Sequence, residues 1–165
     1  MASNQNPRKK TSLATQARHK KRLFLPMDTA DSDKLALRFH MALSLAAQGR
    51  AEASDARCLA EAVMMAALIS DIEMSQIDDA DLAVSEDCLR RRLVRVEFPG
   101  WRLCENEERS LRSVINDYDR QLHQTRLQNL VKATERFERL LESVDSLEKI
   151  FDARRSENLR RPKQG

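Results

Sequence analysis

Apolar residues near the C-terminal end of the chain recur at the spacing of an α-helix. Between residues 127 and 151 they are separated by steps of three or four residues. The positions in this series are Leu127, Leu130, Thr134, Phe137, Leu141, Val144, Leu147 and Phe151. The pattern predicts one long helix over residues 127–153, with an apolar seam that Thr134 interrupts and that slips by one residue near Leu147. Other helices or a second chain must cover such a seam.

The composition of the chain narrows the fold class. Its 165 residues include three Gly, and aromatic residues make up 4% of them. Sandwiches, barrels and nucleotide-binding α/β folds need glycine turns and β-branched strands, so all three are unfavourable here. The sequence therefore predicts an all-α protein. We expect an antiparallel bundle of about five helices, with a long C-terminal helix and disordered basic tails.

Four further helices are expected before the long one. Their approximate ranges are 32–49, 54–72, 86–98 and 105–123. Gly49 suits the position after a helix and Ser54 suits an N-cap, so the first two helices should form an antiparallel hairpin. An acidic loop over 75–85 precedes the third helix. A tight turn at 123–125 separates the fourth helix from the long one, and a continuous helix over 106–153 is the alternative.

The first of these helices carries two apolar stripes. One stripe comprises Leu35, Phe39, Ala42, Leu43 and Ala46. The other comprises Leu37, Met41 and Leu45. Such a wide apolar surface predicts a helix that is buried on two sides. The preceding residues Leu23, Phe24, Leu25 and Met27 are too apolar for a linker, and we expect them to dock on the body or on a partner.

Charged side chains are segregated along the chain. Residues 1–27 contain seven cations and no acid, residues 28–89 contain four cations and 13 acids, and residues 90–165 contain 18 cations and 13 acids. We therefore expect three parts: a disordered basic tail over 1–31, the helical bundle over 32–153 and a second basic tail over 154–165. A basic tail can contact nucleic acid or another acidic surface, or it can fold back on the acidic body.

Nucleic-acid binding through the tails is one of two functions that the sequence supports. Mobile cations are enough for salt-sensitive binding to phosphates that does not depend on base sequence. The cations that would make these contacts are Arg8, Lys9, Lys10, Lys20, Lys21, Arg22, Arg154 and Arg155. Sequence-specific recognition is less favoured, because Glu86 and Asp87 are placed to pair with the arginine run at 90–92. The chain also shows no helix-turn-helix spacing.

Protein binding through helices is the other function, and we favour it. A helix of about 27 residues is roughly 40 Å long and overruns a bundle of shorter neighbours. The apolar side chains near its end are therefore predicted to contact another protein or a second copy of this chain. These residues are Leu141, Val144, Leu147 and Phe151.

Catalytic, metal and cofactor sites are not expected. The chain has three Cys and three His at unrelated spacings and no CxxC pair, which disfavours both a disulfide framework and a zinc site. Glu105, Glu107 and Glu108 resemble a catalytic cluster by number, but they fit better as the first-turn acids of a helix. We expect a protein that is not an enzyme and that holds no cofactor.

Targeting signals are weak. No apolar run approaches the ~18–20 residues of a membrane span, and the first 22 residues lack the apolar segment of a secretory signal. Reduced, partly buried cysteines fit a cytoplasmic protein with no membrane partner. The acid-free N-terminus also fits a mitochondrial presequence, although its cations are clustered and do not follow an amphipathic stripe.

Three features together resemble a family. They are the Lys/Arg/Pro tail, the segment Leu37-Arg38-Phe39-His40-Met41-Ala42-Leu43, and a segment with Leu111-Arg112, Asp119-Arg120-Gln121-Leu122 and Leu130. This arrangement resembles small uncharacterised helical proteins encoded in proteobacterial phage and plasmid regions, over about half of the chain. The long final helix and the second basic tail depart from that pattern. The resemblance implies a bacterial, cytoplasmic accessory protein of a mobile element, and it implies no active site and no particular partner.

Overall fold

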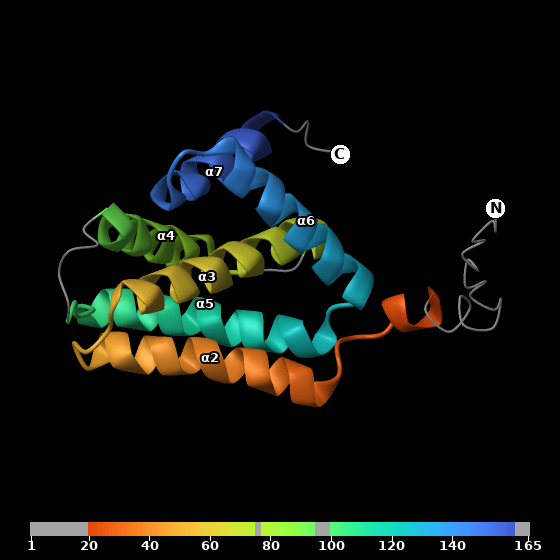
Figure 1. The fold of residues 1–165 in the computed structure, drawn as a ribbon, viewed down its shortest axis with the longest axis horizontal. Coiled ribbons are helices and arrows are strands. Elements are labelled where there is room, and N and C mark those ends of the chain that lie inside the picture. Colours follow the sequence, from red (N-terminus) through yellow and green to blue (C-terminus); the bar gives the residue numbers. More distant parts are fainter. Residues whose placement is uncertain (1–19, 75–76, 95–99, 161–165) are drawn as a thin grey trace, which may run out of the picture.

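The computed structural model of the protein describes residues 20–74, 77–94 and 100–160. In these ranges the chain is helical apart from turns and two isolated β-bridges (Figure 1). The prediction of an all-α protein is confirmed. The elements are α2 (Thr29–Ala47), α3 (Ala53–Glu73), α4 (Asp79–Val94), α5 (Glu105–Gln124), α6 (Leu127–Ser143), a 3-10 helix η1 (Leu147–Lys149) and α7 (Ile150–Arg160).

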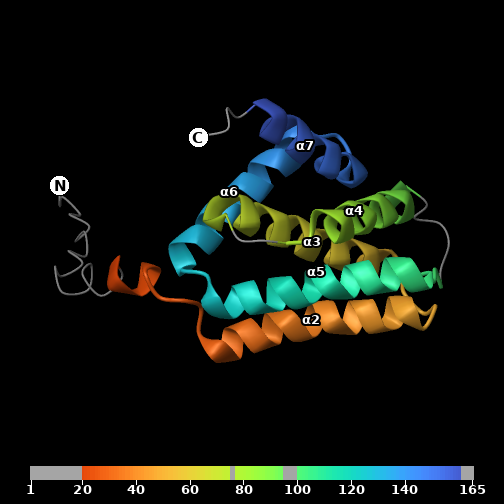
Figure 2. The ribbon, with the colours of Figure 1, turned by 180° about the vertical axis from the view of Figure 1, so that it is seen from behind.

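Helices α2 to α5 form the body, and α3 lies at its centre. Helix α3 packs against α2, α4, α5 and α6. Apart from Glu61, every residue from Cys58 to Ile69 is buried. Alanines at 60, 62, 66 and 67 let the neighbouring helices approach closely. Helix α6 crosses over α3, and η1 brings the chain back against α4 (Figure 2).

The α2–α3 connection differs in detail from the expected one. Helix α2 begins after Asp28, whose carboxylate accepts a hydrogen bond from the backbone N–H of Ala30 at 3.0 Å. Helix α3 begins after Glu52, whose own N–H donates to the Asp55 carboxylate at 2.7 Å. The expected N-cap Ser54 therefore lies inside the first turn of α3. The reciprocal Glu52–Asp55 arrangement satisfies two backbone donors, whereas a single serine side chain satisfies one.

Glycines fix the corner where this hairpin meets the segment that enters α5. Gly49 and Gly100 both have positive φ, of 70° and 76°. The backbone N–H of Gly100 donates to the carbonyl of Ala51 at 3.1 Å, and the indole N–H of Trp101 donates to the carbonyl of Glu52 at 3.2 Å. A Cβ atom on Gly100 would lie 3.1 Å from the carbonyl oxygen of Gly49. The close approach of the two backbones therefore requires glycine.

The expected long C-terminal helix is divided into two. Helix α6 ends at Ser143, and Val144 adopts an extended conformation with φ −118° and ψ 148°. Helix α7 begins only at Ile150. The seam slips by one residue near Leu147, so a straight helix would turn its last apolar residues away from the body. The break instead returns Ile150 and Phe151 to the core, where both are buried.

Two other boundaries differ from those expected. The acids Asp79 and Asp81, expected in a loop, form the first turn of α4, where negative charge is favourable. The Asp78 carboxylate accepts hydrogen bonds from the N–H groups of Ala80 and Asp81. Residues 154–160, expected in a tail, belong to α7. None of the helices in the described ranges combines the length and the apolar character needed to cross a membrane.

Candidate functional site

Buried charges join the C-terminal helices to the body. The guanidinium of Arg136 on α6 is buried and donates to Asp71 at 2.9 Å, to Glu157 at 2.8 Å and to Asn158 at 2.7 Å. Asp71 lies at the end of α3, and Glu157 and Asn158 lie on α7. A buried guanidinium needs such partners, because leaving its charge unpaired away from water is costly. This cluster therefore positions α6 and α7 against each other and against α3.

A second buried ion pair connects α4 with α7. The side chain of Glu86 is 2% exposed, and its two carboxylate oxygens accept from Arg154 at 2.9 Å and from Arg155 at 2.6 Å. The side chain of Arg154 is 8% exposed and also approaches Asp71 at 3.5 Å. The sequence predicted Glu86 as a first-turn acid that pairs with Arg90. That interpretation is wrong, since Glu86 lies in the middle of α4 and Arg90 pairs with Asp87 and Asp152.

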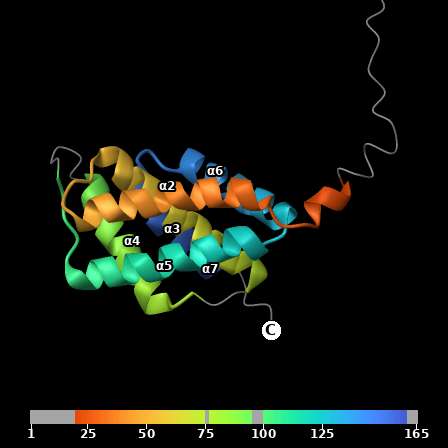
Figure 3. The same cartoon turned by 90° about the horizontal axis from the view of Figure 1, so that it is seen from below.

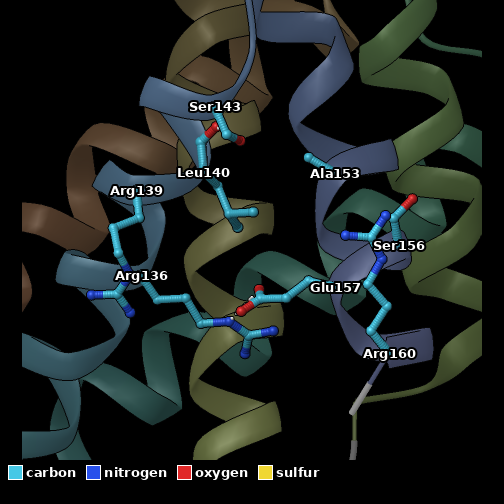
Figure 4. A pocket seen from close by; sticks show the side chains of 8 residues that line it. All are labelled: Arg136, Arg139, Leu140, Ser143, Ala153, Ser156, Glu157 and Arg160. Carbon is cyan, nitrogen blue, oxygen red and sulfur yellow. Dashed lines mark hydrogen bonds and ion pairs between the residues drawn. The ribbon is translucent and has the colours of Figure 1, made fainter.

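A cavity of about 430 Å³ lies between α6 and α7 (Figure 4). The Arg136 and Glu157 side chains point toward each other across it, and Leu140 and Ala153 face it from the two helices. Its lining residues are Arg136, Arg139, Leu140, Ser143, Ala153, Ser156, Glu157 and Arg160. The central polar groups are already paired with each other, so the cavity offers no uncompensated charge at its centre for a ligand.

An apolar groove runs between α2 and α3 on the opposite part of the body. It has a volume of about 430 Å³. Its lining residues are Lys34, Leu37, Arg38, Met41, Ala42, Leu45, Ser54, Asp55 and Cys58. Leu37 is 61% exposed and Met41 is 57% exposed. Both belong to the second apolar stripe of the first predicted helix. The described chain covers Phe39 and Leu43 of the first stripe, and Leu45 of the second stripe packs against the core in part. This groove was not predicted from the sequence, although the width of the apolar surface of the first predicted helix indicated it.

The residues predicted to contact a partner lie mainly inside the chain. Phe151 is buried. Leu141 and Leu147 are partly buried and pack against the core, and Val144 is half-buried at the helix break. Because α7 turns back at residue 150, the same chain covers the seam that an unbroken helix would have exposed. The geometric reason for placing an interface at these four residues is therefore removed.

The basic residues predicted to contact nucleic acid fall into three groups. Arg8, Lys9 and Lys10 lie outside the described residues. Lys20, Lys21 and Arg22 are exposed on a short helical segment before α2. Arg154 is buried and pairs with Glu86 and Asp71, whereas Arg155 also pairs with Glu86 but keeps 42% of its side chain exposed. The two described groups lie on different elements: residues 20–22 lie on the segment before α2, and Arg154 and Arg155 lie on α7.

Glu107 at the start of α5 has a structural role. The buried carboxylate of Glu107 caps α5 by accepting from the N–H of Cys104 at 3.0 Å, and it pairs with Arg91 and Arg92. Burial alone would raise the pKa of Glu107, but the hydrogen bond from Cys104 and the charge of Arg92 outweigh burial and lower it. In the described ranges no three His, Cys, Asp or Glu side chains are arranged to hold a metal ion.

Comparison with known proteins gives no relative. No family model matches the sequence, and neither the curated proteins nor the solved structures contain a match to the chain.

Proposed function

We propose that this protein is a non-enzymatic interaction module that binds an apolar helical segment of another polypeptide in the groove between α2 and α3. The observation that carries the proposal is the exposure of Leu37 and Met41, which lie one helical turn apart on the same face of α2. The role of accessory protein of a bacterial mobile element is part of the same proposal, and it rests on the sequence resemblance described above.

The groove has the chemistry that amphipathic helices use as docking sites. Leu37, Met41 and Leu45 follow one another at four-residue spacing and provide the apolar floor. Methionine adapts to irregular partners because its side chain is unbranched and polarisable. The edges are polar, with Lys34 and Arg38 on α2 and Asp55 on α3. Full burial of a Leu or Met side chain contributes roughly 1.5–3 kcal/mol, so a partner that covers the exposed three-fifths of Leu37 and Met41 would gain about 1–2 kcal/mol for each.

Capture of partners from host lysate tests the proposal. The double variant Leu37→Glu/Met41→Glu places two charges in the groove, and both positions are exposed, so its melting temperature should stay close to that of the wild type. We expect a partner captured by the wild type to be lost from this variant. The matched control is Leu159→Glu, which places a charge at an exposed apolar position on α7 and should retain the partner. Equal capture by the double variant would exclude the groove.

A second candidate function, DNA binding that does not depend on base sequence, is favoured by one observation. Lys20, Lys21 and Arg22 are all exposed, and in the described chain they have no acidic partner. Titration of duplex DNA at two salt concentrations tests it, because contacts with phosphate weaken steeply as salt is raised. We expect the triple variant Lys20→Gln/Lys21→Gln/Arg22→Gln to lose affinity and salt dependence together. An unchanged salt dependence would exclude this segment.

A further inference from the structure

The charged side chains of the α2–α3 groove are distributed unevenly along its length. Lys34 lies in the second turn of α2, and Arg38 lies one turn later. Asp55 lies in the first turn of α3 and Leu45 near the end of α2, so both are close to the connection that joins the two helices. In Figure 3 this connection lies at the end of the body opposite the point where the chain enters α2. The groove therefore has a basic half on the side of the α2 N-terminus and an acidic end at the connection.

These charges can still pair with a partner. Lys34 is exposed, and in the described chain it forms no ion pair. The guanidinium of Arg38 binds Glu61 through one nitrogen, at 3.2 Å, and the Arg38 side chain is 56% exposed. At the other end of the groove, one oxygen of the Asp55 carboxylate accepts from the N–H of Glu52. An acid beside Lys34 and a base beside Asp55 would therefore complement the two ends of the groove.

The length of the groove fits a helix of about three turns. Lys34 and Leu45 are 11 residues apart on α2, which corresponds to roughly 16 Å. In an isolated helix, acids are favourable in the first turn and cations in the last turn, because they complement the helix dipole. A helix with this charge distribution matches the groove when its own N-terminus lies beside Lys34.

We infer that the groove binds a three-turn amphipathic helix of another polypeptide, with an acid in its first turn beside Lys34 and a base in its last turn beside Asp55. The bound helix then runs parallel to α2. This inference rests on the proposed function, because it specifies the charge and the direction of the helix that occupies the same groove. Burial of apolar surface supplies most of the affinity, and the charges select one amphipathic helix over another.

Selection from a displayed library of helical peptides tests the charge of the partner. Each peptide carries a fixed apolar stripe, and the positions that flank the stripe in its first and last turns are randomised. We expect the immobilised full chain to enrich acids in the first turn and bases in the last turn. Lys34→Glu should instead enrich first-turn bases. The matched control is Lys132→Glu, which reverses an exposed charge on α6 and should keep the preference of the wild type.

A charge-reversal cycle with a selected peptide tests the direction of the helix. Because the pair is exposed, Lys34→Glu should weaken binding of the selected peptide about fivefold at low salt, and less at high salt. A peptide whose first-turn acid is replaced by lysine should recover affinity for Lys34→Glu. Reversal of the last-turn base should leave the effect of Lys34→Glu unchanged. Fluorescence anisotropy measures the affinities, and circular dichroism checks that each variant is folded.

Each other result overturns the inference, and the results separate it from the proposed function. If every selected helix still binds Leu37→Glu/Met41→Glu, or if no helix is selected, the groove is not a helix site and both proposals fail. If binding depends on the groove but acids are not enriched in the first turn, the charge assignment is wrong and the proposed function stands. If Lys34 couples to the last turn of the peptide, the helix runs in the opposite direction and the inference fails alone.

Discussion

The carboxylate of Glu86 and the guanidinium of Arg154 form an ion pair at 2.9 Å inside the protein, although the two residues are 68 positions apart in the sequence. Neither charge has much access to water, so each is tolerated because the other is present. Arg155 completes the arrangement by binding the second oxygen of the same carboxylate. Helix α7 is thus held on the body by buried charges as well as by Ile150 and Phe151.

Removal of the Glu86 charge should therefore strongly destabilise the protein. The substitution Glu86→Ala leaves the buried guanidinium of Arg154 without its main partner, and breaking such a pair typically costs about 3–5 kcal/mol. The free energy of unfolding in urea measures the loss. The control is Glu105→Ala, which removes an exposed carboxylate paired with Arg109 and should cost less than about 1 kcal/mol. Similar losses for the two variants would contradict the buried-pair interpretation.

Phe151 should behave as a core residue. Its ring is buried, and replacement of a buried Phe by Ala typically costs about 3–5 kcal/mol because a cavity remains. We expect Phe151→Ala to lower the free energy of unfolding by that amount, and Val144→Ala, at the half-buried helix break, to lower it much less. Equilibrium denaturation measures both. If Phe151 instead faced a second chain, sedimentation would show a smaller assembly for the variant, and the free energy of unfolding of the monomer would stay unchanged.

Thiol reactivity should separate the three cysteines. Cys88 is fully buried, and desolvation raises the pKa of its thiol to about 12, so it remains protonated near pH 8. Burial also raises the pKa of Cys58, whereas Cys104 is exposed. We expect Ellman's reagent to find one rapidly reacting thiol in the folded protein and three in denaturant. Cys104→Ser should abolish the rapid phase, and a rapid phase that persists would contradict this assignment.

Local signals predicted α5 well. Its expected range, 105–123, differs from the observed Glu105–Gln124 by one residue. Acids in the first turn mark its beginning, and Leu111, Ile115 and Leu122 recur on the face that is buried. For α2, the two stripes predicted burial on two sides, and the chain itself covers the second of them only in part. The exposed part of that stripe lines the groove on which the proposed function depends.

The buried charges could not be predicted in the same way. Glu86 and Arg90 have the four-residue spacing of an exposed helical ion pair, so the sequence around Glu86 contains no sign of its burial. Its partners become close only because the chain breaks at Val144 and α7 turns back. The apolar steps continue through this break, and their slip near Leu147 was the one local indication. Contacts between distant segments therefore determine this cluster.

Stability should fall as the pH rises through the titration of His123. Nδ1 of the ring lies 2.9 Å from the carbonyl oxygen of Asp119. Nε2 lies 2.9 Å from a carboxylate oxygen of Asp33. Both partners accept hydrogen bonds, so both ring nitrogens can donate only when the imidazole is protonated. The hydrogen bond to the Asp119 carbonyl, followed by that to Asp33, raises the pKa of His123 above its ordinary value. Protonated His123 thus joins α2 to the last turn of α5.

The sign of this effect follows from linkage. Because the pKa is raised in the folded state, the stabilisation is fully present below the unfolded value of about 6.5 and is lost as the pH rises through the folded value. Between pH 6 and pH 8 we therefore expect the melting temperature of the wild type to fall more than that of His123→Gln. The variant Asp33→Asn should reduce the difference, since it replaces the charged carboxylate that accepts from Nε2 with a neutral amide. A wild type and a His123→Gln variant with parallel pH profiles would show that folding does not raise the pKa of His123, and would contradict the prediction.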